Sequence, residues 1–131
     1  MTLRIPRILA FAILLLVLQV AIGFAFGGGA ALDDAQLLSR YFAELGVGAV
    51  VTFGVFALFA LGLSRAYYLS AALVVVLAEA VGFVLIRFLG TPPTSSVLWL
   101  FEWAVYLAAV VIGTEVGRRL AAARSLRKEN A

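Results

Sequence analysis

The sequence contains no cysteine and no histidine, and only 13% of its residues are charged. The missing residues exclude disulfides, thiol nucleophiles, imidazole acid–base catalysis and the usual kinds of zinc site. Hydrophobic residues make up 65% of the chain, whereas soluble domains carry about 45–50% apolar and about 25% charged residues. This composition is typical of an integral membrane protein.

Four apolar runs have the length of about 17–25 residues that crosses a bilayer as a helix. They occupy residues 8–26, 46–63, 68–89 and 97–117, and a basic stub follows at 118–131. Gly27–Gly29 interrupts the pattern after the first run, and Pro92 and Pro93 interrupt it before the fourth. We therefore predict an all-α integral membrane protein, an antiparallel bundle of four transmembrane helices that forms a single membrane domain over residues 1–131.

The first run has two interpretations, a retained spanning helix and a cleaved signal peptide. Arg4 and Arg7 precede it and small residues follow it, as in a signal peptide. The apolar run has 19 residues, however, whereas the apolar region of a signal peptide has about 7–15. We therefore expect a retained helix.

Residues 33–45 are amphipathic. Asp33 and Gln36 have the spacing of a capping box, and the apolar side chains after them share one helical face, from which Glu44 is excluded. We predict a short extracytoplasmic amphipathic helix at the membrane surface, between the first and second spanning helices. The alternative is that these residues are the first turns of the second spanning helix, with Gly46 and Gly48 at a bend.

The basic residues predict the orientation of the chain. With the N-terminus inside, the outer helix ends carry only Arg40 and Arg87. The inner ends carry Arg4, Arg7, Arg65, Arg118, Arg119, Arg124, Arg127 and Lys128. This positive-inside bias predicts a bacterial-type inner membrane protein with both termini in the cytoplasm. It also explains the high isoelectric point, so that we expect no nucleic-acid partner.

Two glycine patterns indicate close helix packing. Gly46, Gly54 and Gly62 recur every eight residues, and Gly113 and Gly117 form a GxxxG motif that Ala109 extends. Small residues on one face allow two helix backbones to approach each other, although glycine is also common in membrane helices in general.

Glu79 is the most informative residue because it falls at the centre of the third run. An acidic side chain at that depth is costly and needs a partner, a proton or water. Gln19 and Tyr106 fall at the same level, and Thr52 falls slightly outward, if the helices are antiparallel. We interpret these four residues as a candidate proton or cation site in which Glu79 is protonated at neutral pH. The alternative is a structural role, in which a neutral Glu79 is hydrogen-bonded to a neighbouring helix or to the same residue in a second subunit.

Further charged residues predict contacts near the membrane surfaces. Glu102 and Arg87 are expected to form an outer ion pair, which is structural or acts as a gate. Glu115 is expected to form an inner ion pair with Arg65 or Arg119. Anionic lipid head groups are expected to contact the basic residues Arg118, Arg119, Arg124, Arg127 and Lys128.

These patterns lead to three functional hypotheses. The favoured one is an accessory, assembly or oligomeric membrane subunit without chemistry of its own, and the alternative is a small proton-coupled transporter or cation channel that uses Glu79. An enzyme is the least favoured, because it would need a cluster of polar groups at one membrane interface. The expected partners are the lipid bilayer and a homo-oligomer or larger membrane complex, with no cofactor and no metal.

Overall fold

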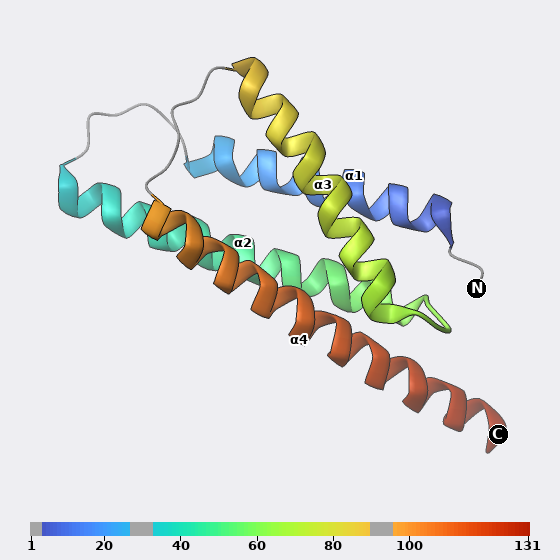
Figure 1. Cartoon of the computed structure of the whole chain (residues 1–131). Helices are drawn as coiled ribbons and strands as arrows, with labels where there is room; N and C mark the ends of the chain where they lie inside the picture. Colours follow the sequence, from blue (N-terminus) through green and yellow to red (C-terminus); the bar gives the residue numbers. More distant parts are fainter. Residues whose placement is uncertain (1–3, 27–32, 90–95) are drawn as a thin grey trace.

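A computed structural model describes residues 4–26, 33–89 and 96–131 of the chain. The described residues form four α-helices and no strand (Figure 1): α1 (Ile5–Phe26), α2 (Asp34–Leu61), α3 (Tyr67–Leu89) and α4 (Ser96–Glu129). Each helix is long and apolar enough to cross a membrane, as in a multi-pass membrane protein. The all-α class and the four long apolar helices are confirmed, whereas the predicted break at Gly27–Gly29 lies outside the described residues.

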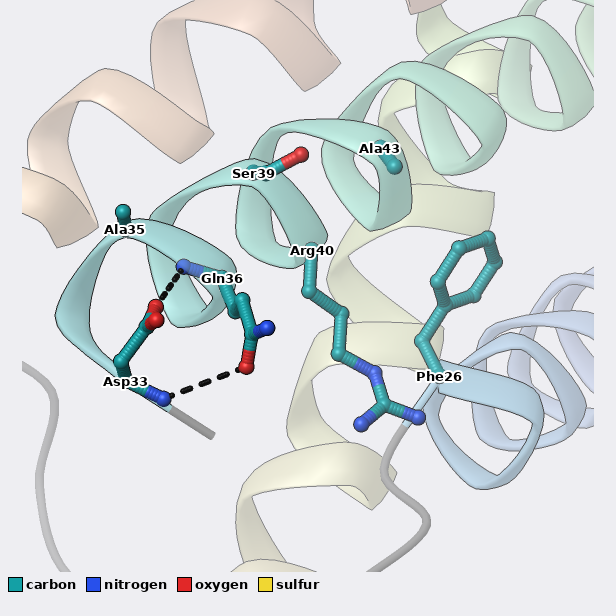
Figure 2. Close-up of a pocket in the computed structure, with 7 residues that line it drawn as sticks. All are labelled: Phe26, Asp33, Ala35, Gln36, Ser39, Arg40 and Ala43. Carbon is teal, nitrogen blue, oxygen red and sulfur yellow. Dashed lines mark hydrogen bonds between the residues drawn. The ribbon is translucent and has the colours of Figure 1, made fainter. Parts of the chain in front are cut away.

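The prediction of a separate amphipathic helix at residues 33–45 is wrong, because α2 continues without a break from Asp34 to Leu61. Leu45 is buried, so packing against the rest of the chain overrides the weak helix preference of the glycines that follow it. The capping box is present (Figure 2): the Gln36 amide donates to Asp33 Oδ1 at 2.7 Å, and the Asp33 amide donates to Gln36 Oε1 at 3.3 Å. Residues 34–45 are therefore the first turns of the second long helix.

Helices α2 and α4 make the most extensive contact, and they lie side by side and run in the same direction (Figure 1). Two glycines of α4 allow this approach. A Cβ atom added to Gly113 would lie 2.5 Å from the carbonyl oxygen of Phe53, and one added to Gly117 would overlap the carbonyl of Ala57. The backbones of the two helices are therefore in direct contact, as small residues permit in membrane proteins. Ala109, one turn earlier, is also buried.

The other glycine pattern does not form a helix interface within the chain. A Cβ atom added to Gly46 or Gly54 would meet no atom within 4 Å, and Val50 between them is 71% exposed. Close packing at these two positions does not occur within the single chain, because this face of α2 points away from the other helices, and packing against another polypeptide stays a prediction. Gly62 is enclosed, but by the side chain of Arg7 rather than by a helix backbone.

The apolar core lies toward the end of the bundle where α1 begins and α2 ends. Phe56, Phe59 and Val74 are completely buried there, between α1, α2 and α3. Toward its other end α3 diverges from α4 (Figure 1), and Phe83 and Phe88 are 63% and 86% exposed. The molecule is thus closely packed at one end and open at the other, which creates the cavity described below.

Candidate functional site

A cavity of about 390 Å³ lies between the four helices, on the side where α3 and α4 diverge. Its lining combines six apolar side chains with eight that carry a polar group, and none of the residues that line it is basic. The polar lining consists of Gln19 from α1, Glu44 and Thr52 from α2, Glu79 from α3, and Trp99, Glu102, Trp103 and Tyr106 from α4.

The four residues of the predicted proton or cation site all line this one cavity. Gln19, Thr52, Glu79 and Tyr106 come from four different helices, and the antiparallel succession of the helices brings them together. Within the described part of the chain, no hydrogen bond joins Glu79 to Gln19 or to Tyr106. A hydrogen bond from Glu79 to a neighbouring helix is therefore not the arrangement in this structure, in which Glu79 lines the cavity, and a bond to a second subunit stays a prediction.

The hydroxyl groups in the cavity are placed by local packing. Thr52 is 2% exposed, and its hydroxyl has no hydrogen-bond partner among the described residues. Tyr106 packs directly on Gly48, one turn before Thr52, and any larger residue there would collide with the phenol ring. Gly48 therefore allows the Tyr106 hydroxyl to lie against α2.

Two further carboxylates face the cavity, and sequence reasoning placed both elsewhere. Glu44 was expected to face water, but Glu44 Oε1 lies 3.9 Å from the Cβ position of Gly23 on α1. Glu44 is four residues before Gly48 and eight residues before Thr52. When residues 34–61 form one helix, these spacings place the three residues on the same face. The structure therefore adds Glu44 to the predicted site.

Glu102 lines the same cavity instead of forming the predicted outer ion pair. Arg87 is exposed, and its guanidinium lies 5.7 Å from the centre of the Phe83 ring on its own helix. Among the described residues the only ion pairs within 4.0 Å involve Glu115, so the prediction of a pair between Arg87 and Glu102 is wrong. The physical reason is the divergence of α3 from α4, which separates the end of α3 from the start of α4 (Figure 1).

A smaller space of about 100 Å³ adjoins the cavity between α2 and α4. Tyr41, Glu44 and Leu45 line it from α2, and Glu102 and Tyr106 line it from α4. The hydroxyl of Tyr41 is buried and has no hydrogen-bond partner in the described ranges. Glu44, Glu102 and Tyr106 line both the cavity and the smaller space, so the two spaces share these three polar side chains.

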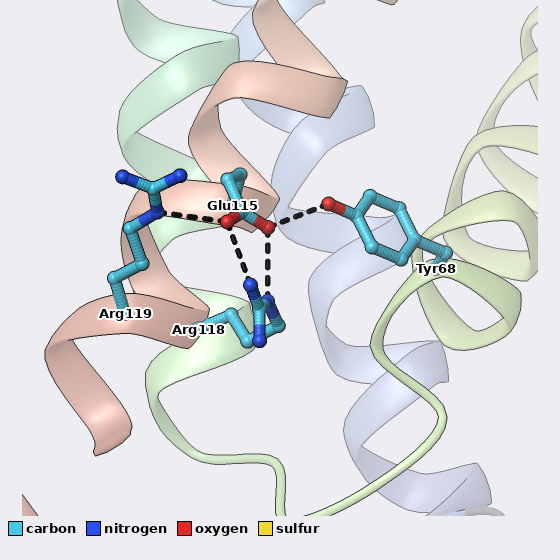
Figure 3. A network of polar contacts seen from close by, with 4 residues as sticks. All are labelled: Tyr68, Glu115, Arg118 and Arg119. Atoms are coloured by element: carbon cyan, nitrogen blue, oxygen red, sulfur yellow. Dashed lines mark hydrogen bonds and ion pairs between the residues drawn. The ribbon is translucent and has the colours of Figure 1, made fainter.

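At the opposite end, Glu115 organises a cluster of polar contacts (Figure 3). Its carboxylate accepts hydrogen bonds from the Tyr68 hydroxyl at 2.7 Å, from Arg118 Nε and Nη2 at 2.9 and 2.7 Å, and from Arg119 Nε at 2.8 Å. The hydrogen bonds to Glu115 raise the pKa of the Arg118 guanidinium above its usual value. Arg65 is not part of this cluster, in which the Tyr68 hydroxyl contacts Glu115 from α3.

Arg7 has a structural role that its place in the basic N-terminal segment did not indicate. Its Nη2 donates to the carbonyl oxygens of Leu58 at 3.0 Å and Phe59 at 3.1 Å, at the end of α2. The guanidinium also lies 5.0 Å from the centre of the Phe11 ring. Arg7 thus binds carbonyls in the last turn of α2, where its charge complements the helix dipole.

The five residues predicted to contact anionic lipid fall into two groups. Arg118 and Arg119 are paired with Glu115. A separate groove of about 1050 Å³, formed by the extension of α4 and the α2–α3 link, is lined by Arg124, Arg127 and Lys128. These three residues of the basic stub lie on α4, which continues to Glu129.

The described residues contain no group of three or more carboxylates, histidines or cysteines that could hold a metal ion. Fold and cavity together define a small, multi-pass all-α membrane protein with a carboxylate-lined cavity between its helices. The chain matches no protein-family model, no curated protein and no solved structure. Its function is therefore inferred from the cavity itself.

Proposed function

We propose that the cavity binds protons or monovalent cations, and that the protein is a small proton-coupled transporter or cation channel. The observation that carries this proposal is the presence of Glu44, Glu79 and Glu102 around one cavity with no basic residue in its lining. Carboxylates inside a membrane are costly unless a proton, a cation or water compensates them. An accessory subunit without chemistry would have no need of this arrangement. We therefore favour the transporter or channel over the accessory subunit.

Glu79 is the central residue of the proposed site. It lies near the middle of a helix of 23 residues, about 18 Å from the start of that helix at 1.5 Å per residue. Gln19, Thr52 and Tyr106 supply amide and hydroxyl groups that can donate to a carboxylate or accept from a protonated one. The site can therefore accommodate Glu79 with and without its proton, as a group that exchanges a proton for a cation must.

The proposed membrane arrangement is an antiparallel bundle in a bacterial-type inner membrane, with both termini in the cytoplasm. The positive-inside distribution of the basic residues supports this orientation. Reporter fusions at Ala131 and within residues 91–96 should report opposite sides of the membrane. Reporters on the same side would mean that α4 does not cross the membrane.

The functional test is ion flux into liposomes that contain the purified protein, with Glu79→Gln as the variant. We expect the wild type to carry protons or Na⁺ or K⁺ down an imposed gradient, and Glu79→Gln to lose most of this flux, because the amide cannot release a proton or carry a negative charge. The matched control is Glu129→Gln, which makes the same chemical change at an exposed position near the end of α4. Equal flux through wild type and Glu79→Gln would refute the assignment of Glu79.

A second function, that of an accessory or oligomeric membrane subunit, is supported by the outer half of α3. Its large apolar side chains, including Phe83 and Phe88, contact little of the rest of the chain. A second copy or a larger membrane complex would cover this surface, and lipid would cover it otherwise. The absence of flux from the wild type, together with a stable oligomer in sedimentation in detergent, would favour this function.

A further inference from the structure

The small space between α2 and α4 has the composition of a proton-binding site. Its volume of about 100 Å³ is enough for about three water molecules at roughly 30 Å³ each. The groups that can bind there all present oxygen: the carboxylates of Glu44 and Glu102 and the hydroxyls of Tyr41 and Tyr106. The Tyr41 hydroxyl is buried, makes no well-formed hydrogen bond among the described residues, and interacts with the nearby Glu102 carboxylate, to which it can donate.

This space lies on the outer side of Glu79. Glu44 is eight residues before Thr52 on α2, or about 12 Å along the helix axis. Glu102 is four residues before Tyr106 on α4, or about 6 Å along the axis. Since both glutamates also line the main cavity, they stand between the outer helix ends and Glu79.

The charges around the pair favour one retained proton. Arg40, one turn before Glu44, is the nearest basic residue on α2; its charge opposes a proton on Glu44, but its side chain extends toward Phe26 at the end of α1 (Figure 2). Helix α3 contributes only Glu79, through the main cavity, and α1 contributes no charged residue to its lining. Two carboxylates that share a small space repel each other, so that a proton on one of them is the simplest compensation.

The geometry points to a second proton-binding site, in which Glu44 and Glu102 hold one proton between them and pass it to Glu79. The inference rests on the proposed function, since it treats the main cavity as the place to which the proton moves. The pair takes its proton from water at the outer ends of the helices. In the transfer, the O–H bond on the pair breaks and one forms on the ionised carboxylate of Glu79, after which the pair takes up another proton. Thr52, buried and without a hydrogen-bond partner among the described residues, lines the main cavity together with these glutamates.

The test is infrared spectroscopy of the protein in lipid nanodiscs at pH 7, in a Glu79→Gln background that removes the contribution of Glu79. We expect a protonated carboxyl band equivalent to one group per chain. Glu44→Gln should remove it, and Glu102→Gln should remove it as well, because a shared proton needs both carboxylates. The double variant should lose the same single band and no more.

Equal loss of the band in the two single variants and in the double variant distinguishes one proton shared by the pair from two independently protonated groups. A band equivalent to two groups, additive losses, or no band at all would overturn the inference. A band that appears only when Na⁺ and K⁺ are replaced by N-methylglucamine would also overturn it, because the pair would then bind an alkali cation. Glu129→Gln in the same background is the matched control and should leave the band unchanged.

A variant that keeps both carboxylates covers the case in which Glu44→Gln or Glu102→Gln fails to fold. Tyr41→Phe removes only the buried hydroxyl, so it should shift the frequency of the band and preserve its intensity. An unchanged frequency would overturn the placement of Tyr41 at the pair.

All these measurements are made without Glu79, whereas the proposed function is tested by flux through the chain that contains it. The shared proton and the proposed function can therefore be refuted independently of each other.

Discussion

Replacing one glycine by alanine should destabilise the protein at Gly113 and not at Gly54, although the chemical change is identical. At Gly113 the new Cβ atom would lie 2.5 Å from the carbonyl oxygen of Phe53 and 3.2 Å from its carbonyl carbon and Cα, all of them backbone atoms that cannot rotate away. Helices α2 and α4 must then move apart, and such overpacking costs about 1–3 kcal/mol. At Gly54 no atom lies within 4 Å, so that alanine brings only its better helix propensity, about 0.5–1 kcal/mol of stabilisation.

The assay is reversible unfolding in mixed micelles as the fraction of SDS is raised, followed by the fluorescence of Trp99 and Trp103. Both tryptophans are on α4, so their signal reports on the helix that the substitution displaces. We expect Gly113→Ala to unfold at a lower SDS fraction than the wild type, and Gly54→Ala at the same or a higher fraction. If Gly113→Ala is as stable as Gly54→Ala, the backbone contact between α2 and α4 does not contribute to stability, and the reasoning fails.

Two further predictions concern basic residues. Arg7→Lys keeps the positive charge and therefore the orientation of α1, but it loses the paired contacts to the carbonyls of Leu58 and Phe59. It should therefore lower the free energy of unfolding by about 1–2 kcal/mol in the same assay. Unchanged stability would leave Arg7 only a role in orientation. Neutralising Arg124, Arg127 and Lys128 together should weaken binding of the protein to phosphatidylglycerol by about 1 kcal/mol per charge, as measured by lipid competition in detergent. The matched control is Arg118→Gln with Arg119→Gln, which should change lipid binding less because Glu115 already neutralises part of that charge; an equal effect of the two sets would show that only net charge matters.

Much of the candidate site could be predicted from depth along the helices. Gln19, Thr52, Glu79 and Tyr106 were placed at one level by counting 1.5 Å per residue in an antiparallel order, and they line one cavity. Depth alone does not determine which face of a helix meets which neighbour. That is why Glu102 was assigned to Arg87, which lies at a similar depth but on a helix that diverges from α4.

The amino-acid sequence by itself determined the class of the fold, because long apolar runs without charge can bury their backbone polar groups in a membrane only as helices. The tertiary structure decided the continuity of α2, since burial of Leu45 and packing of Tyr106 on Gly48 outweigh the local preferences of single residues. It also decided which glycines allow close contact, because a small residue permits an approach but does not supply the partner helix. The gathering of three carboxylates around one cavity likewise depends on how α1 to α4 cross, and that is set by the packing of whole helices rather than by any one segment.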